Sequence, residues 1–457
     1  MQPSIESPQN IQQALHLIRS NKLSEAIKIL EQELSSNPKN PDALHLMGVV
    51  AYQAGLFQSA IDLIESAIRI RTEEPRYYND CGEAYRRMGN LGAGIARFRR
   101  ALVLDPGCLS AHNNLGSAFM EEGKIEQAMA SFRHVLQIDP QNADAHYNLS
   151  LALLLTGDFR AGWEEYKWRW ESAQKQFKRN FSAALWNGGP QEERTVLIYC
   201  EQGLGDALQF IRYIPLVQAR VGRVVVECRK ELVRLFKSIP EISLIEYGQS
   251  EPECDLQLPI MSLPGVFGAT IDNIPARIPY LFSEPEIAKH WQNRIGAHKE
   301  LKVGIAWAGN KNHVNDYNRS CPFELFQPLL QIPGIHFFSL QKRDVQDPPL
   351  PDFKGSLMDY SAELNDFADT AGLISALDLV ISVDTAVAHL AGALGKPVWM
   401  LLPFVPDWRW MLKRNDSPWY PTMRLFRQSA AGNWPPLIKQ IAEELSATEN
   451  KTERRFF

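Results

Sequence analysis

The first part of the chain repeats small and bulky side chains at a fixed interval of 34 residues. Small residues hold two phases of this interval, and they are Ala14, Gly48, Gly82, Gly116 and Ser150 in one and Ala26, Ala60, Gly94, Ala128 and Gly162 in the other. A third phase is always bulky, with Leu30, Ile64, Phe98, Phe132 and Tyr166. The interval is that of the tetratricopeptide repeat, in which small residues let paired helices approach and large ones fill the gap.

The repeats extend over residues 7–175 in this interpretation. Four full repeats run from about Ser7 to Asn142, and a fifth drifts into the tryptophan-rich segment 162–170. Such arrays stack into a superhelix whose concave face suits an extended peptide or a protein partner, while a spacer or a dimerisation arm is the alternative. We expect Asn79 and Asn113 to form an amide ladder that grips a peptide backbone, although simple solvation explains both residues nearly as well.

A different pattern follows a polar junction and predicts a first α/β lobe over residues 190–298. The short apolar run Val196–Cys200 is a strand, and the glycines at 203 and 205 then allow a tight turn before Asp206 opens a helix. Further strands and helices alternate, which is typical of a parallel sheet. The proline-punctuated segment Asp255–Pro264 is expected near the sheet edge.

A second α/β lobe is predicted over residues 299–448, ending in a helix at 436–445. Its central feature is Leu379–Leu402, which reads as a buried strand, a polar turn, a short helix and another buried strand. Asp384 and Thr385 are helix-capping types, and His389 shares a helix face with Thr385. The amino end of this helix presents N–H groups suited to a phosphate, whereas plain capping is the alternative.

The predicted fold class is therefore α + α/β: an N-terminal tetratricopeptide solenoid followed by two Rossmann-like lobes. In a parallel sheet, turns that follow strands lie at the carboxyl edge, where ligands bind. We expect the turn bearing Asp206 and the turn bearing Thr385 to face each other over an open gap that binds a ligand.

Composition excludes several other classes of function. A net charge of −5 with 22% charged residues gives no basic excess for nucleic acid. The six cysteines form no CxxC pair and no zinc-type cluster, so buried thiols in a reducing compartment are expected. The amino terminus carries no basic-then-apolar signal, and no apolar run reaches membrane-spanning length, which predicts a cytoplasmic protein without a transmembrane segment.

Several motifs of the α/β half resemble two-lobed glycosyltransferases of the GT-B type, and more closely the heptosyltransferase family. The first lobe carries GLGD at 203–206, and the second carries the Asp-Thr-x-x-x-His pattern that starts at Asp384. The preceding repeats, the string WAGNKNHVNDYNRS and the later DWRW…SPWYP look like bacterial repeat-bearing glycosyltransferases. The resemblance covers the chain from Ser7 to Leu445.

This resemblance implies roles for particular residues. Asp206 would be the general base on the acceptor hydroxyl, and Arg319 would contact the donor phosphate. Thr385 and the N–H groups of Ala386 and Val387 would hold the diphosphate, with His389 bracing it. The other expected donor-binding residues are Gly203, Gly205, Asp384, Trp307 and Asn310. Those expected to line the acceptor side are Gln202, His313, Asp316, Asp407 and Trp408.

The resemblance and the motifs together predict a glycosyltransferase that uses a nucleotide sugar, with its hydroxyl acceptor on a protein recruited by the repeats. No Asp-x-Asp pair occurs in the α/β half, so we expect no metal and no cofactor, and the resemblance implies inverting transfer. A glycolipid acceptor is one alternative. The other is a non-catalytic repeat scaffold whose α/β half has lost turnover. The aromatic loop that contains Trp408 is suited to stack a base or a sugar ring, and a local hydrophobic plug is the alternative for that loop.

Overall fold

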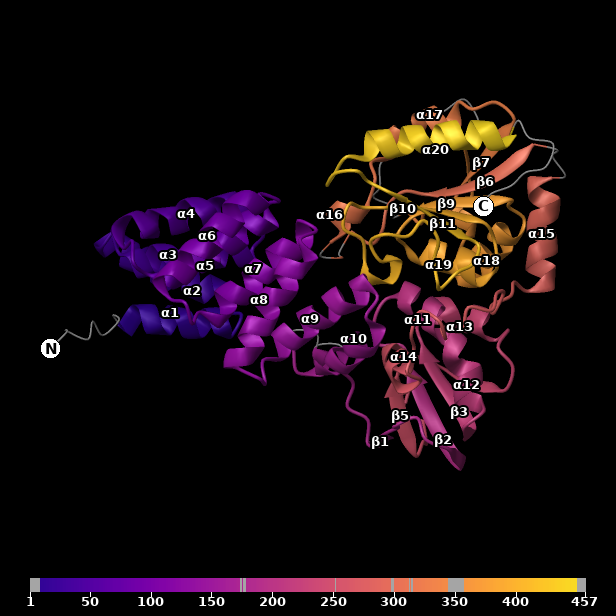
Figure 1. The fold of residues 1–457 in the computed structure, drawn as a ribbon, viewed down its shortest axis with the longest axis horizontal. Helices are drawn as coiled ribbons and strands as arrows, with labels where there is room; N and C mark the ends of the chain where they lie inside the picture. The colour runs from indigo at the N-terminus through magenta and orange to yellow at the C-terminus, as the bar shows by residue number, and fades with distance from the viewer. Residues whose placement is uncertain are drawn as a thin grey trace. The chain divides into compact units, whose positions relative to one another are not determined.

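The computed structural model describes residues 9–449 apart from 173–174, 176–177, 251, 297–299, 312, 314 and 344–356. It contains two compact units, Met1–Ala152 and Leu153–Phe457, which divide inside helix α9 (Ala143–Thr156) (Figure 1). The predicted start of the repeats at Ser7 lies outside the described residues. The predicted domain limits at 175, 190 and 298 stay predictions.

The first unit is a solenoid of antiparallel helix pairs, as predicted. The helices are α1 Gln9–Arg19, α2 Leu23–Ser36, α3 Pro41–Gln53, α4 Phe57–Ile70, α5 Pro75–Arg87, α6 Leu91–Leu104, α7 Leu109–Glu121 and α8 Ile125–Ile138. The turn inside each pair contains one residue in the left-handed region, again every 34 residues, and these are Asn21, Gly55, Gly89 and Gly123. Glycine and asparagine adopt this conformation at the lowest cost, so the period extends to the turns.

Small and bulky repeat positions meet across each helix pair. A Cβ atom on Gly82 would lie 2.7 Å from the ring of Phe98, and one on Gly116 would lie 2.5 Å from the ring of Phe132. Neither distance leaves room for a side chain, because carbon atoms in contact stay about 3.5 to 4 Å apart. The predicted packing of paired helices through these phases is confirmed.

The asparagines of the first helices join successive repeats through a different pairing from the one expected. Asn114 donates from Nδ2 to Oδ1 of Asn79 at 3.0 Å, and Asn148 donates to Asn113 at 3.1 Å. The partners are thus 35 residues apart, and the expected pairing of Asn79 with Asn113 is wrong. Equivalent residues of parallel helices lie level with each other, so a side chain reaches the next position on the neighbouring helix. These amides hold repeat to repeat.

The first α/β lobe is a five-stranded parallel sheet in the order β1-β5-β2-β3-β4. Its strands are β1 Ala184–Leu185, β2 Gln191–Tyr199, β3 Val221–Cys228, β4 Ile242–Glu246 and β5 Leu256–Pro259. Its helices are α11 Leu204–Phe210, α12 Ile214–Gln218, α13 Lys230–Phe236 and α14 Leu263–Val266. The segment expected near the sheet edge contains β5, which pairs with β2 and β1 and is therefore an interior strand.

The second lobe is a six-stranded parallel sheet in the order β11-β10-β9-β6-β7-β8. Its strands are β6 Leu301–Ala306, β7 Ile335–Ser339, β8 Leu357–Asp359, β9 Leu379–Val383, β10 Val398–Leu402 and β11 Met423–Arg427. Its main helices are α15 Pro285–Ile295, α16 Asp316–Arg319, α17 Gln327–Leu330, α18 Phe367–Ser375, α19 Ala386–Ala393 and α20 Trp434–Glu449. Figure 1 shows α17 and α20 over one face of the sheet and α18 and α19 over the other.

Strand order reverses once in each sheet, and that is where a ligand crevice forms in doubly wound folds. In the first lobe the chain reverses between β2 and β5, and in the second between β6 and β9. The turn after β2 leads into α11, and the turn after β9 leads into α19. Both turns chosen from the sequence therefore leave a strand at the reversal point of its sheet. No helix in the described part of the chain is both long and apolar enough to cross a membrane.

Candidate active site

The two turns face each other and touch. A Cβ atom on Gly205 would lie 2.9 Å from Cδ2 of His389 and 3.5 Å from Cα of Ala386. Gly205 has no positive φ, so it is required here by close approach and not by turn geometry. The lobes thus oppose these turns as expected, but the gap expected between them is closed at this contact. A ligand has to lie beside it.

The candidate base Asp206 is held at both of its oxygens. Oδ2 accepts the N–H of Gly203, the residue preceding α11, at 2.7 Å. Oδ1 accepts a hydrogen bond from Nη2 of Arg409, in the second lobe, at 2.5 Å. The side chain of Asp206 keeps 20% of its surface exposed, so the oriented carboxylate still reaches solvent.

Arg409 is the functional candidate that sequence reasoning missed. It lies in the short 3-10 turn Trp408–Trp410, is 7% exposed, and bonds Oδ1 of Asp407 at 2.8 Å and Oε1 of Gln209 at 2.6 Å. The DWRW string marked this loop, but nothing along the chain indicates a partner 203 residues away. Asp407, expected on the acceptor side, anchors Arg409 and also caps the turn through the N–H of residue 409.

The turn of the second lobe leaves its helix end uncapped. Thr385 precedes α19, but its hydroxyl makes no capping bond and lies 3.1 Å from Oγ of Ser382. The N–H groups of Ala388 and His389 bond the carbonyl of Thr385. Those of Ala386 and Val387 form no hydrogen bond within the described part of the chain, and both residues are partly exposed. Two backbone donors are therefore available at the positive end of a helix.

His389 supports this turn from inside the protein. It is 4% exposed, stacks on Trp410 at 5.4 Å between ring centroids, and its Nδ1 lies 2.8 Å from the hydroxyl of Tyr420. Burial and then the charges of Arg409 and two further arginines lower its pKa well below the usual value. The imidazole is therefore neutral, and its Nε2 lies 3.8 Å from Oδ1 of Asp384.

Charged residues of the loop after β6 complete this side of the site. Arg319 bonds Oδ1 of Asp316 at 3.2 Å and keeps 19% of its side chain exposed. Its guanidinium packs on Gly309, where a Cβ atom would lie 2.5 Å from Nη2. Burial and the neighbouring carboxylate of Asp407 raise the pKa of Asp384. The site therefore mixes arginines and carboxylates from both lobes.

Two tryptophans expected at the ligand are largely buried. Trp307 is 7% exposed and packs on Phe323 at 4.3 Å between centroids, within the core of the second lobe. Trp408 is 5% exposed and packs edge-on against Trp163 at 5.3 Å. Protein covers most of both rings, and direct contact of either ring with a ligand stays a prediction.

The remaining predicted residues lie near the two turns. Asn310 and His313 are exposed in the loop after β6, and the N–H of His313 bonds the carbonyl of Asn310 at 2.9 Å. Gln202 is partly exposed and donates from Nε2 to the hydroxyl of Tyr166 at 3.4 Å. Direct contacts of these three side chains with a substrate stay predictions.

The segment that ends the predicted repeats packs against the first lobe. It comprises α10 (Phe159–Tyr166) and the 3-10 turn Lys167–Trp170. Arg169, almost fully buried, bonds Ser262 at 2.6 Å and lies 3.5 Å from Oε1 of Glu201. Burial raises the pKa of Glu201 to about 7 despite this arginine. The segment thereby fixes the residues just before the turn of Asp206.

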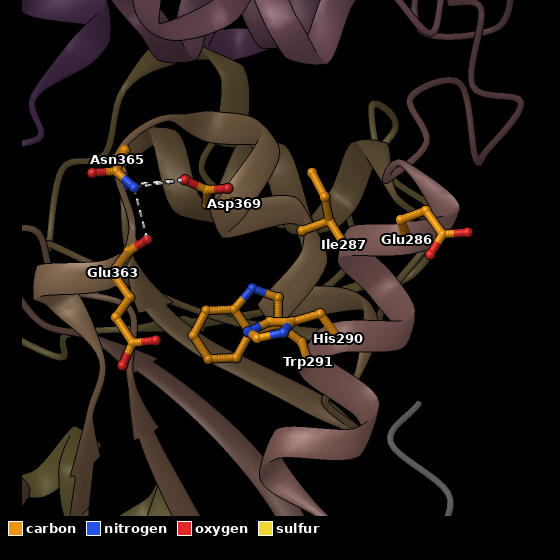
Figure 2. Close-up of a pocket in the computed structure, with 7 residues that line it drawn as sticks. All are labelled: Glu286, Ile287, His290, Trp291, Glu363, Asn365 and Asp369. Carbon is orange, nitrogen blue, oxygen red and sulfur yellow. Dashed lines mark hydrogen bonds between the residues drawn. The ribbon is translucent and has the colours of Figure 1, made fainter.

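A hollow of about 290 Å³ lies elsewhere on the second lobe, between α15 and the start of α18 (Figure 2). Its lining residues are Glu286, Ile287, His290, Trp291, Glu363, Asn365 and Asp369. Figure 2 shows Asn365 bonded to Asp369 and to the carbonyl of Glu363, at 3.2 Å each. None of the predicted site residues lines it. No group of three or more His, Cys, Asp or Glu side chains among the described residues could hold a metal ion.

Helical repeats followed by two parallel-sheet lobes with opposed turns define a repeat-bearing protein with a two-lobed α/β half. The family model described as glycosyltransferase family 9 (heptosyltransferase) matches residues 363–401, which include the turn of Thr385. Models of the tetratricopeptide repeat match residues 17–79 and 116–157. The chain therefore joins tetratricopeptide repeats to a region that matches the heptosyltransferase family.

One relative is similar over nearly the whole chain. Protein FlbA of Caulobacter vibrioides is 24% identical over 473 residues, which cover 96% of this chain and 72% of that protein. Among solved structures, MamA is 21% identical with a TM-score of 0.31 and covers 36% of this chain and 97% of its own. PilW, titled a type IV pilus biogenesis factor, is 23% identical with a TM-score of 0.34 and covers 37% and 82%.

Proposed function

We propose that the chain is a glycosyltransferase that moves a sugar from a nucleotide-sugar donor to a hydroxyl acceptor. The observation that carries the proposal is the opposition of two unlike turns. One presents the oriented carboxylate of Asp206, and the other presents the unbonded N–H groups of Ala386 and Val387. The match to glycosyltransferase family 9 includes the second of these turns.

In the proposed reaction Asp206 is the general base. It takes the proton of the acceptor hydroxyl while the acceptor oxygen forms a bond to the anomeric carbon. The bond from that carbon to the donor phosphate oxygen breaks, and the nucleoside diphosphate leaves with the electron pair. One displacement inverts the anomeric configuration.

The second lobe would stabilise the leaving group. A diphosphate at the start of α19 would accept from the N–H groups of Ala386 and Val387 and gain from the helix dipole. Arg319 would offset the charge that builds on the diphosphate, so the proposed reaction requires no metal. Because Gly205 closes the gap at Ala386, the donor would lie beside that contact, toward Asp384 and Arg319.

The repeats would recruit the acceptor, which we propose to be a hydroxyl on a protein or peptide held by the concave face of the solenoid. A second candidate function is a peptide-binding scaffold without turnover. It is favoured by the contact between Gly205 and Ala386 and by the bond from Arg409 to the candidate base.

A thermal-shift screen against UDP-, GDP-, ADP- and CMP-sugars tests donor binding. A donor whose free concentration is 100 times its dissociation constant stabilises the fold by about 2.7 kcal/mol and raises the temperature midpoint of unfolding. No shift across this panel would favour the scaffold.

The Asp206→Asn variant tests turnover. We expect it to keep the donor-dependent shift but to release nucleoside diphosphate about 10² to 10⁴ times more slowly, the usual contribution of a general base. Asp272→Asn, an exposed residue of the same lobe, is the control and should turn over normally. Full turnover of Asp206→Asn would refute the assignment of the base.

A further inference from the structure

Among the residues that the structure describes, three arginines cross between the two lobes, and one of them touches the candidate base. Arg212 of the first lobe donates to the carbonyl of Trp419 and to the hydroxyl of Tyr280. Arg234, also of the first lobe, bonds Asp369 of the second at 2.6 Å. Arg409 runs in the opposite direction, from the second lobe to Asp206 of the first.

The guanidinium of Arg409 is fixed on every side. Nε bonds Oε1 of Gln209 at 2.6 Å, Nη1 bonds Asp407 at 2.8 Å, and Nη2 bonds Asp206 at 2.5 Å. Its plane lies over the ring of Trp408, with the central carbon 4.4 Å from the ring centroid. Two of the three acceptors belong to α11, whereas Asp407 belongs to the same lobe as Arg409.

We propose that Arg409 is the positioning residue of the candidate base and aims its carboxylate only while the two lobes are together. This inference rests on the proposed function. Arg409 is already anchored by Asp407, so it would travel with the second lobe if the lobes separated. Of these two bonds, Asp206 would then keep that from the N–H of Gly203. Loss of the guanidinium would free the carboxylate to rotate away from the acceptor hydroxyl.

The geometry leaves the base able to act. A carboxylate has about four lone-pair positions, and the bonds from Gly203 and Arg409 occupy one on each oxygen. With 20% of the side chain exposed, a hydroxyl can reach the remaining positions.

The test compares Arg409→Gln and Arg409→Lys with Arg234→Gln, which removes a lobe-crossing arginine that does not touch Asp206. Release of nucleoside diphosphate is followed over a range of donor concentrations with whichever sugar nucleotide of the four-member panel is turned over. We expect Arg409→Gln to lower kcat by about 10- to 100-fold and to leave the KM of the donor unchanged, because a small displacement of a catalytic group has an effect of this order. Arg409→Lys should recover part of the lost kcat, and Arg234→Gln should leave kcat unchanged.

An unchanged kcat in Arg409→Gln, or an equal loss of kcat in Arg234→Gln, would overturn the proposal. A second measurement does not need turnover. We compare the temperature midpoints of unfolding of Arg409→Gln, Asp206→Asn and the double variant. The falls in midpoint should be non-additive, so that the double variant falls by less than the sum of the two single variants. Additive losses would overturn the pairing itself. If the two losses are coupled but the unchanged protein turns over no donor, the proposed function is refuted, and with it the role of Arg409 in positioning a base.

Discussion

The two turns of the site have the same architecture and opposite chemistry. Each leaves a parallel strand where its sheet reverses order and enters a short helix. In the first lobe, the turn presents the carboxylate of Asp206, which accepts the N–H of Gly203, the residue before α11. In the second, Thr385 turns its hydroxyl to Ser382, and the first N–H groups of α19 form no hydrogen bond within the described part of the chain.

Under the proposed function, the two turns act on different groups of the substrates. A turn that presents a carboxylate is suited to withdraw a proton, and it repels a phosphate. A turn that presents N–H groups without a carboxylate attracts an anion. The contact between the turns would then bring the proposed base and the proposed anion site together without either neutralising the other. The predictions below test whether the two turns differ in this way.

The largest difference is expected when the first helical N–H of each turn is removed. Proline at the first position of a helix deletes an N–H that has no partner within the helix and fits the backbone there. Thr385 and Gly203 both have the extended conformation that a following proline requires. Ala386→Pro should weaken donor binding by about 10- to 100-fold, since a hydrogen bond to a charged group contributes about 1.5 to 3 kcal/mol.

Leu204→Pro makes the same change at the first position of α11 and is the matched control. It should leave donor affinity unchanged when binding is measured by titration calorimetry with the sugar nucleotide that gives a thermal shift. Equal weakening by both variants would show that the turns do not differ as anion sites.

The next effect concerns the contact between the turns. Gly205→Ala places a methyl group 2.9 Å from the ring of His389, which Tyr420 and Trp410 hold in place. Overpacking of this kind costs about 1 to 3 kcal/mol. Gly203→Ala in the same turn meets only Oδ2 of Asp206, at 3.0 Å, and should cost less. Urea unfolding of both variants measures the difference, and equal costs would mean that the lobes do not press together at Gly205.

Local periodicity explains what the sequence predicted well. The repeat phases were readable because each unit presents the same contact, as between Gly82 and Phe98, every 34 residues. The first strand of the segment Leu379–Leu402, observed at Leu379–Val383, was predictable because a buried parallel strand has a continuous apolar run and clear stops. The repeat and the apolar run can each be recognised within a stretch of a few tens of residues.

The rest of the site depends on contacts that leave no local pattern. Arg409 and Asp206 are 203 residues apart, and an arginine in an aromatic loop does not indicate a carboxylate on another lobe. Gly205 read as a turn glycine, although its neighbour is His389. Trp408 was expected to line the site, but residues of α10 cover it. Tertiary packing decided each of these cases.

The smallest expected effect is a difference in how residues beside the two turns make the free energy of unfolding depend on pH. Burial raises the pKa of Glu201, beside the first turn, to about 7 from 4.5, so its contribution to stability is present below about pH 4.5 and is lost as pH rises through 7. Burial lowers the pKa of His389, so its contribution is present above about pH 6.5 and is lost as pH falls. Each slope is at most about 1.4 kcal/mol per pH unit.

Urea unfolding of Glu201→Gln and His389→Gln between pH 5 and 8 measures both slopes. Relative to the unchanged protein, Glu201→Gln should gain stability from pH 6 to 8, and His389→Gln should gain stability from pH 6.5 to 5. Constant costs, such as leaving Arg169 without its carboxylate, cancel because only slopes are compared. Glu193→Gln, an exposed residue of β2, is the control with an unchanged slope. Slopes of the same sign in both variants would contradict the opposite electrostatic environments of the two turns.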